Sequence, residues 1–306
     1  AIGLGRAGAN QSRFIAGDLF YENERGRMIG LIVFAGTIGA VLGPLLVTPG
    51  TWLSNYFQID SNTGPWVIAI IFYALATLFT FIMLRPEPMD IAKVIEADEN
   101  KRKKKKMLND KGRSVRELLM LPRVQLAVIS MLLSQVVMVT LMVMTPLHMA
   151  HNGHSAGNVG FVISAHTMGM FGFSWLTGYL IDRFGRVPMM IAAAITLIAS
   201  AIVAPLGTSM PFLVTGLFLL GLGWNFGYVA GSSLLSDALE GAEKSRMQGA
   251  NDMMVAGAAA LGSFSSGPLF ATGGYTTIAA LGIVIAVLFI WIIRLLSPAE
   301  TQYHSA

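Results

Sequence analysis

The sequence has no cysteine and few charged residues, and each absence excludes a class of protein. Without cysteine there is no disulfide framework and no thiolate chemistry. Charged residues make up 12% of the 306 residues, against roughly 25% in soluble domains, while hydrophobic residues make up 54%. Several apolar runs are long enough to cross a bilayer, and they are continuous rather than alternating with polar residues. The composition predicts an all-α, polytopic membrane protein, because helices satisfy their own backbone hydrogen bonds in lipid.

The beginning of the sequence lacks both a signal peptide and an initiator methionine. Residues 1–19 are rich in glycine and alanine and predict a transmembrane helix whose start is missing. Gly3, Gly5 and Gly8 match the glycine spacing of a dinucleotide-binding loop, but no strand precedes them, so the motif is very weak support for dinucleotide binding. We expect the sequence to be a fragment of a longer chain.

Eight further apolar runs predict complete membrane spans. They lie at about 28–47, 65–84, 124–147, 157–180, 187–206, 211–235, 248–270 and 276–296. Apart from Arg6 and Arg13 in the first segment, every Lys and Arg falls on alternate junctions or at the ends of spans that open there. Because cytoplasmic loops collect basic residues, the loops that contain Arg183 and Lys244 are predicted to be cytoplasmic. Arg294 ends the last span on the same side, which places the C-terminus in the cytoplasm.

The spans divide the chain into three parts. Residues 1–84 hold the first segment and two spans, residues 85–123 form one long polar segment, and residues 124–306 hold six spans. The polar segment contains the basic run Lys101–Lys106, which predicts a solvated cytoplasmic loop; binding of this run to anionic lipid headgroups is the alternative. Because the basic residues follow the membrane topology, we expect no nucleic-acid partner.

The most specific motif is a short charged turn between two predicted spans. It covers 178–188, and its defining residues are Gly178, Asp182, Arg183, Gly185 and Arg186. A turn this tight makes the flanking helices antiparallel neighbours, and Asp182 can pair with Arg183 or Arg186 at the membrane surface. The motif resembles the signature cytoplasmic loop of the major facilitator superfamily, in the copy between helices eight and nine. The alternative is an ordinary positively charged hairpin.

An internal repeat supports the same resemblance. Arg27 and Arg246 are each followed by methionine, each opens a predicted span, and they are 219 residues apart. In this register Gly43 matches Gly262, and six spans separate the two starts, as a parallel repeat of two six-helix halves predicts. The resemblance implies the superfamily fold, with helices 4–12 of a six-plus-six pseudo-repeat present and helices one to three absent.

A glycine-proline motif lies in the span that the repeat assigns to helix five. Its residues are Gly39, Gly43 and Pro44, and they resemble the core of a motif found in that helix of many proton-coupled antiporters. This resemblance implies efflux of a drug or metabolite as an alternative function. Val47 and Thr48 replace the trailing glycine pair of the motif, which departs from the antiporter pattern.

Polar and aromatic side chains inside the spans predict a substrate cavity, because burying polar groups in lipid is costly. The candidate cavity residues are Arg6, Asn10, Gln135, His166, Trp224, Asn225 and Tyr228. Ordinary helix packing is the alternative. His166 is either a proton carrier or a hydrogen-bonded core residue. The helical spacing of Trp224 and Tyr228 is equally typical of side chains that pack against a neighbouring helix.

No arrangement of residues predicts an enzyme, a cofactor or a metal site. His148, His151 and His154 share one outer junction, but a metal centre needs further ligands and a polar loop explains them better.

The resemblance implies a secondary active transporter that moves a small solute by alternating access, and proton or sodium coupling is expected by analogy. Asp182, Arg183 and Arg186 would form its cytoplasmic gate. We expect an integral protein of the cytoplasmic (inner) or plasma membrane, monomeric as a full-length chain. A membrane sensor or assembly protein that has the same fold but does not transport is an alternative from another class.

Overall fold

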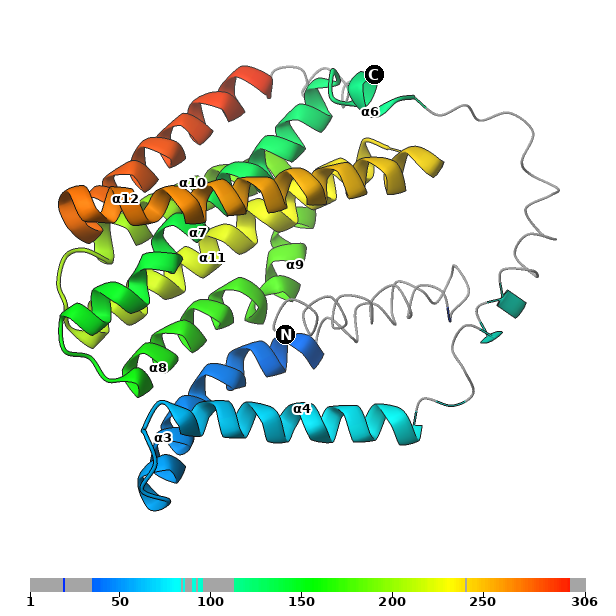
Figure 1. The fold of residues 1–306 in the computed structure, drawn as a ribbon. Helices are drawn as coiled ribbons and strands as arrows, with labels where there is room; N and C mark the ends of the chain where they lie inside the picture. Colours follow the sequence, from blue (N-terminus) through cyan, green and yellow to red (C-terminus); the bar gives the residue numbers. More distant parts are fainter. Residues whose placement is uncertain are drawn as a thin grey trace. The chain divides into compact units, whose positions relative to one another are not determined.

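The chain is helical throughout the part that the structure describes. The computed structural model describes residues 19, 35–83, 85, 90–91, 93–95, 113–239 and 241–297. These residues contain no strand, and six of their helices, or seven if a bent pair is counted as one span, can cross a membrane by length and composition. The predicted all-α polytopic fold is confirmed. Two compact units make up the chain, Ala1–Lys111 and Gly112–Ala306 (Figure 1).

The described residues of the first unit include two apolar helices joined by a short loop. One runs over Ala35–Tyr56 and consists of residues 35–42, the 3₁₀ turn η1 (Gly43–Leu46) and α3 (Val47–Tyr56); the other is α4 (Thr63–Met83). The predicted end of the first span near Val47 is wrong, because the helix continues to Tyr56. Pro49 falls in the first turn of α3, where its missing N–H costs little. Trp52 therefore lies on α3.

The second unit is a helical bundle. After the short α6 (Val115–Leu118) come α7 (Pro122–His151), α8 (Ala156–Thr167), the π-helical turn η2 (Met168–Gly172), α9 (Ser174–Phe184), α10 (Arg186–Val203), α11 (Met210–Asp237) and α12 (Gly241–Leu296). Local sequence explains several helix starts. Pro122 and Pro211 stand in first turns, where proline suits a helix, and Ser114 and Ser155 cap α6 and α8 with their side chains.

Three of the predicted spans belong to interrupted helices. The segment α8–η2 meets α9 at a bend of 41°, so the span expected at 157–180 is a broken helix. Within α12, Gly273 and Gly274 have non-helical dihedral angles. The 51 residues of Arg246–Leu296 would extend about 75 Å as one straight helix, far more than the roughly 30 Å of a bilayer core. The break therefore divides this stretch into two spans, as the sequence predicts.

Helix α11 has the most neighbours in the second unit, since it packs against α7, α8, η2 and α10 (Figure 1). Gly221 lets α11 approach α8 closely, because a Cβ at this position would overlap the backbone carbonyl of His166. Ser130 of α7 donates a hydrogen bond to the Gly227 carbonyl at 2.8 Å, and Ser200 of α10 makes the same contact with the Gly216 carbonyl. Small residues and buried hydroxyls join helices in lipid, where apolar surface gives no driving force.

Two apolar clusters fill the second unit, and polar side chains form a layer at the level where one cluster meets the other. On α7, Met131 belongs to one cluster and Val137 to the other. On α11, Ala230 belongs to the same cluster as Met131, and Leu220 belongs to the same cluster as Val137. Gln135 lies between Met131 and Val137, and the other candidate polar residues of α11 lie between Leu220 and Ala230. Apolar packing continues through this layer, since Trp224 belongs to one cluster and Tyr228 packs against both.

Candidate functional site

The charged motif at 178–188 is almost entirely helical. α9 continues to Phe184 and α10 begins at Arg186, so only Gly185 lies outside a helix. Its φ of 91° is in the left-handed region, which favours glycine, and its N–H donates to the Ile181 carbonyl at 2.8 Å. A single residue therefore ends α9 and redirects the chain into α10. Gly178 lies on α9 and has open space beside its Cα.

Arg186 binds a different carboxylate from the one expected. Its guanidinium lies 2.8 Å from the carboxylate of Asp237 and joins the start of α10 to the end of α11. Within the described ranges, Asp182 forms no ion pair with Arg183 or Arg186, which corrects the predicted pairing. Arg183 instead donates to the hydroxyl of Tyr179 at 3.3 Å and lies over a neighbouring aromatic ring. The gating role of Asp182 and Arg183 stays a prediction.

Arg113 and Glu243 form the most extensive ionic contact at this end of the bundle. The backbone N–H and Nε of Arg113 donate to Oε1 of Glu243 at 2.7 and 3.0 Å, and Nη2 donates to Oε2 at 2.8 Å. Arg246 donates to the Arg113 carbonyl at 2.8 Å. The side-chain and backbone hydrogen bonds from Arg113 lower the pKa of Glu243 to about 2. We call Arg113, Glu243 and Arg246 the basic clasp.

Sequence reasoning missed the basic clasp, although the repeat contains a signal for half of it. Glu243 stands three residues before Arg246, and Glu24 stands three residues before Arg27, so both copies share the pattern Glu-x-x-Arg-Met. A carboxylate kept at one distance from an arginine in both copies suggests a common role. Arg113 could not be found in this way, because it precedes Glu243 by 130 residues.

Four side chains gather in the polar layer of the second unit, and we call them the aromatic cluster. The indole N–H of Trp224 on α11 donates to Oε1 of Gln135 on α7 at 2.7 Å. Trp224 also stacks on Tyr228, with ring centroids 4.7 Å apart, and meets Phe171 of η2 edge-on at 5.8 Å. The structure thus brings together three predicted cavity residues. Phe171 was not singled out from the sequence, because a phenylalanine in an apolar run carries no signal.

His166 and Asn225 make helix-packing contacts. Only 2% and 1% of their surfaces are exposed. Nδ1 of His166 lies 2.9 Å from the Leu217 carbonyl of α11, and the amide of Asn225 donates to the Met170 carbonyl at 2.6 Å and to the Ser174 hydroxyl at 2.9 Å. A π-turn disturbs the regular hydrogen bonds of a helix. The hydrogen bond from Asn225 to a carbonyl of η2 therefore stabilises the bend beside this turn. These contacts match the packing alternative for both residues.

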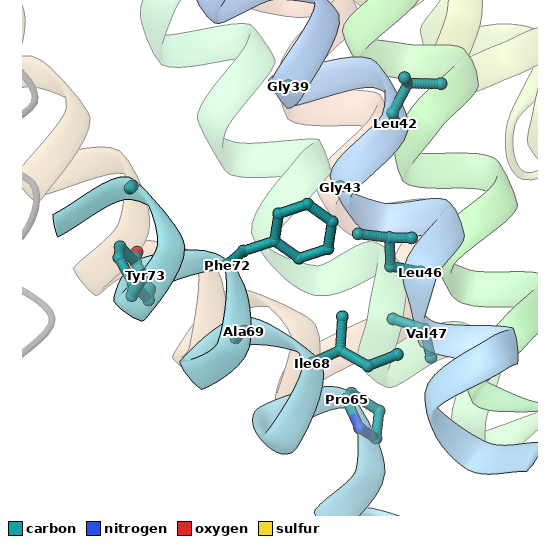
Figure 2. A pocket seen from close by; sticks show the side chains of 11 residues that line it. Gly39, Leu42, Gly43, Leu46, Val47, Pro65, Ile68, Ala69, Phe72 and Tyr73 are labelled. Atoms are coloured by element: carbon teal, nitrogen blue, oxygen red, sulfur yellow. The ribbon is translucent and has the colours of Figure 1, made fainter. Parts of the chain in front are cut away.

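The glycine-proline motif lies beside an apolar groove in the first unit. The groove has a volume of about 660 Å³ and lies between the helix over Ala35–Tyr56 and α4. Gly39 and Gly43 line it, and a Cβ at either position would meet no other atom within 4 Å. Phe72 projects from α4 toward the opposite helix (Figure 2). The candidates Arg6, Asn10 and Lys101–Lys106 lie outside the described residues.

Uncharged contacts close the opposite end of the second unit. The hydroxyls of Tyr275 and Thr145 are 2.9 Å apart, and the Tyr275 ring stacks on His148 with centroids 4.6 Å apart. Nε2 of His154 lies 2.6 Å from the Thr208 carbonyl. In the part of the chain that the structure describes, no three His, Cys, Asp or Glu side chains are grouped so that they could hold a metal ion.

The sequence matches the model of one protein family over nearly its whole length. The model of the Major Facilitator Superfamily matches residues 1–153 and 126–305, nearly the whole chain. The chain belongs to the major facilitator superfamily. The family predicted from the motif at 178–188 is therefore confirmed, and this superfamily member is an integral, multi-pass membrane protein.

Three relatives align over most of this superfamily member. It is 36% identical over 297 residues to YdeG and 33% identical over 291 residues to YddS, both named uncharacterized MFS-type transporters of Bacillus subtilis. Each alignment covers 94% of this chain and 66% of the relative. It is 30% identical over 266 residues to the riboflavin transporter RfnT of Brucella anthropi, which covers 87% of this chain and 63% of RfnT. The chain thus spans about two thirds of the length of these relatives.

Proposed function

We propose that this protein is a secondary active transporter, which moves a small solute across the membrane by alternating access with proton or sodium coupling. The aromatic cluster is the observation that carries the proposal. Gln135, Trp224 and Tyr228 place hydrogen-bonding groups inside apolar spans, where polar side chains are costly and mark solute pathways. Membership of the superfamily, and relatives that are named transporters, support the same activity.

Solute uptake by the full-length gene product in proteoliposomes tests this proposal. Riboflavin is the first solute to try, because RfnT is named a riboflavin transporter. We expect an imposed proton or sodium gradient to drive uptake, and Gln135→Leu to slow it about tenfold through the loss of one hydrogen bond. Trp175→Phe, at a site that is 76% exposed on α9, is the matched control. A folded protein that takes up no solute from a broad panel under either gradient would favour the sensor or assembly alternative.

The motif at 178–188 supplies a second test of transport. If Asp182 is part of a cytoplasmic gate, Asp182→Asn slows uptake about tenfold without changing the melting temperature, because the side chain is exposed and makes no described ion pair. Normal uptake by a folded Asp182→Asn protein would remove Asp182 from the gate.

Drug or metabolite efflux is a second candidate, and the apolar groove beside Gly39 and Gly43 favours it. Gly43→Leu would fill the groove and block approach of another helix, so we expect resistance of a drug-sensitive host to fall. Gly36→Leu, which also has open space beside it but does not line the groove, should keep resistance. Equal resistance with Gly43→Leu and the unmodified protein would contradict efflux through this motif.

A further inference from the structure

We propose that the aromatic cluster of Phe171, Trp224, Tyr228 and Gln135 is a binding subsite for the ring of an uncharged, planar heteroaromatic solute that carries hydrogen-bond acceptors. The inference rests on the proposed transport function and names the class of solute that this unit takes. Charge, ring geometry and the hydrogen bonding of Gln135 each support it independently.

The spans of the second unit offer a solute almost no charge. Residues 124–181, 187–236 and 253–293 contain no Lys, Arg, Asp or Glu, and the charged residues inside the predicted spans of this unit are Asp252 and Arg294, at the basic ends of their spans. His166 is the titratable side chain of α8, and it is buried against the Leu217 carbonyl. A charged group in a medium of low dielectric constant needs an opposite charge nearby. The part of the solute that meets this unit is therefore uncharged, and any charged substituent has to reach beyond it.

The rings of the cluster are arranged for stacking. Trp224 is 9% exposed, whereas the remaining described tryptophans, at positions 52, 66, 175 and 291, are 57% to 76% exposed. Phe171 and Tyr228, which contact Trp224 edge-on and face-to-face, are only partly buried. The partly covered rings of Phe171 and Tyr228 stand beside the buried indole at 74° and 21° to its plane, so a planar ring can meet them by offset stacking or by edge contacts.

Gln135 adds a requirement for acceptors. The indole N–H of Trp224 can only donate, so the amide oxygen of Gln135 must be the atom that faces it, and the amide NH₂ is turned away. In the described part of the chain, Gln135 makes one side-chain hydrogen bond, in which its Oε1 accepts from Trp224. The Gln135 side chain is half-buried. Two N–H donors are thus available in an apolar layer. Carbonyl oxygens or ring nitrogens of a heteroaromatic solute match them.

The cluster is also held in place by the bend between η2 and α9. Phe171 belongs to η2, and Asn225, the residue after Trp224, donates to the Met170 carbonyl of the same turn. The rings are therefore fixed from both helices before a solute arrives, which reduces the entropy lost on binding.

Tryptophan fluorescence of the full-length gene product in nanodiscs tests the subsite without requiring transport. The protein would keep Trp224 as its single tryptophan, with the others replaced by phenylalanine. The probe is lumichrome, an uncharged planar tricycle with ring carbonyls, and ribitol serves as the non-aromatic control. We expect saturable quenching by lumichrome and none by ribitol. Gln135→Leu and Phe171→Leu should each raise the Kd about tenfold.

A protein with Trp175 as its single tryptophan separates binding from partition into lipid. Trp175 is 76% exposed on α9, and lumichrome should quench it without saturation. Saturable quenching of both proteins alike, or a Kd unchanged by Gln135→Leu, would overturn the subsite.

If the single-tryptophan protein does not fold, equilibrium dialysis of the unmodified protein against lumichrome replaces it, with Tyr228→Leu compared with the exposed Tyr179→Leu. Uptake without saturable quenching would support transport and exclude the subsite. Saturable quenching without uptake would support the subsite and contradict transport.

Discussion

The two ends of the second unit are held together by opposite kinds of contact. At the basic end, Arg186 pairs with Asp237 and the basic clasp joins Arg113 to Glu243. At the neutral end, the hydroxyl and ring of Tyr275 bind α7, and the junctions at 148–156, 207–210 and 271–275 contain no Lys, Arg, Asp or Glu. Ion pairs near the surface weaken with salt and acid, whereas stacked rings and hydroxyl bonds respond little. Solution conditions can therefore loosen one end without the other.

The neutral end should show the largest effect of a single substitution. Tyr275→Leu removes a buried ring that stacks on His148 and the hydroxyl that bonds Thr145, so we expect a loss of about 2–4 kcal/mol in unfolding free energy. Tyr275→Phe, the matched control, removes the hydroxyl alone and should lose about 1 kcal/mol. Denaturant unfolding in detergent at low and high salt measures both. A loss that shrinks markedly in high salt would contradict an uncharged closure.

The basic clasp should show the opposite salt dependence. Glu243→Gln removes the negative charge that Arg113 contacts through three hydrogen bonds, so the melting temperature should fall by several degrees at low salt and by less at about 0.5 M salt. Asp182→Asn, a carboxylate in no described ion pair, is the control and should change neither value. An equal fall for Glu243→Gln at both salt concentrations would show that packing, not charge, holds this end.

Acid should release the basic end in a defined pH range. Hydrogen bonds from Arg113 lower the pKa of Glu243 in the folded protein to about 2, from an ordinary value of 4.5. The stabilisation is therefore complete above pH 4.5 and is lost as the pH falls from 4.5 toward 2. Bonds from Ser114 lower the pKa of Glu117 and act in the same direction. Melting temperatures measured between these limits should decline less steeply in Glu243→Gln; identical slopes would exclude Glu243 as the titrating group.

The pair between α10 and α11 should matter least to stability. Arg186 and Asp237 are 31% and 50% exposed in their side chains, so water and salt screen the pair. We expect Asp237→Asn to cost about 0.5 kcal/mol or less, and Arg186→Gln the same. A double-mutant cycle in denaturant unfolding would measure the coupling. A coupling well above 1 kcal/mol would place this pair with the basic clasp as a closure of the basic end.

Hydropathy predicted the helical spans, and the motif at 178–188 predicted the family and the compact turn at Gly185, because each depends on a short stretch of sequence. Predictions that needed a partner fared worse. Arg186 was expected to bind Asp182 four residues away, but it binds Asp237 on another helix. The span predicted at 28–47 was expected to end near Val47, yet the helix continues to Tyr56, and Pro49 fits the first turn of α3. No feature of the apolar run at 157–180 predicted the break at η2.

The sequence alone determined that this chain crosses the membrane repeatedly as helices, because apolar length and the position of basic residues are sums over neighbouring residues. Only the tertiary structure decided what each polar side chain does. Asn225 and Trp224 are adjacent on α11, yet Asn225 donates a hydrogen bond to η2 beside the bend, and Trp224 donates one to Gln135, which lies 89 residues earlier. In lipid a polar group must find its hydrogen bonds within the protein, so its role is set by the helix that happens to face it.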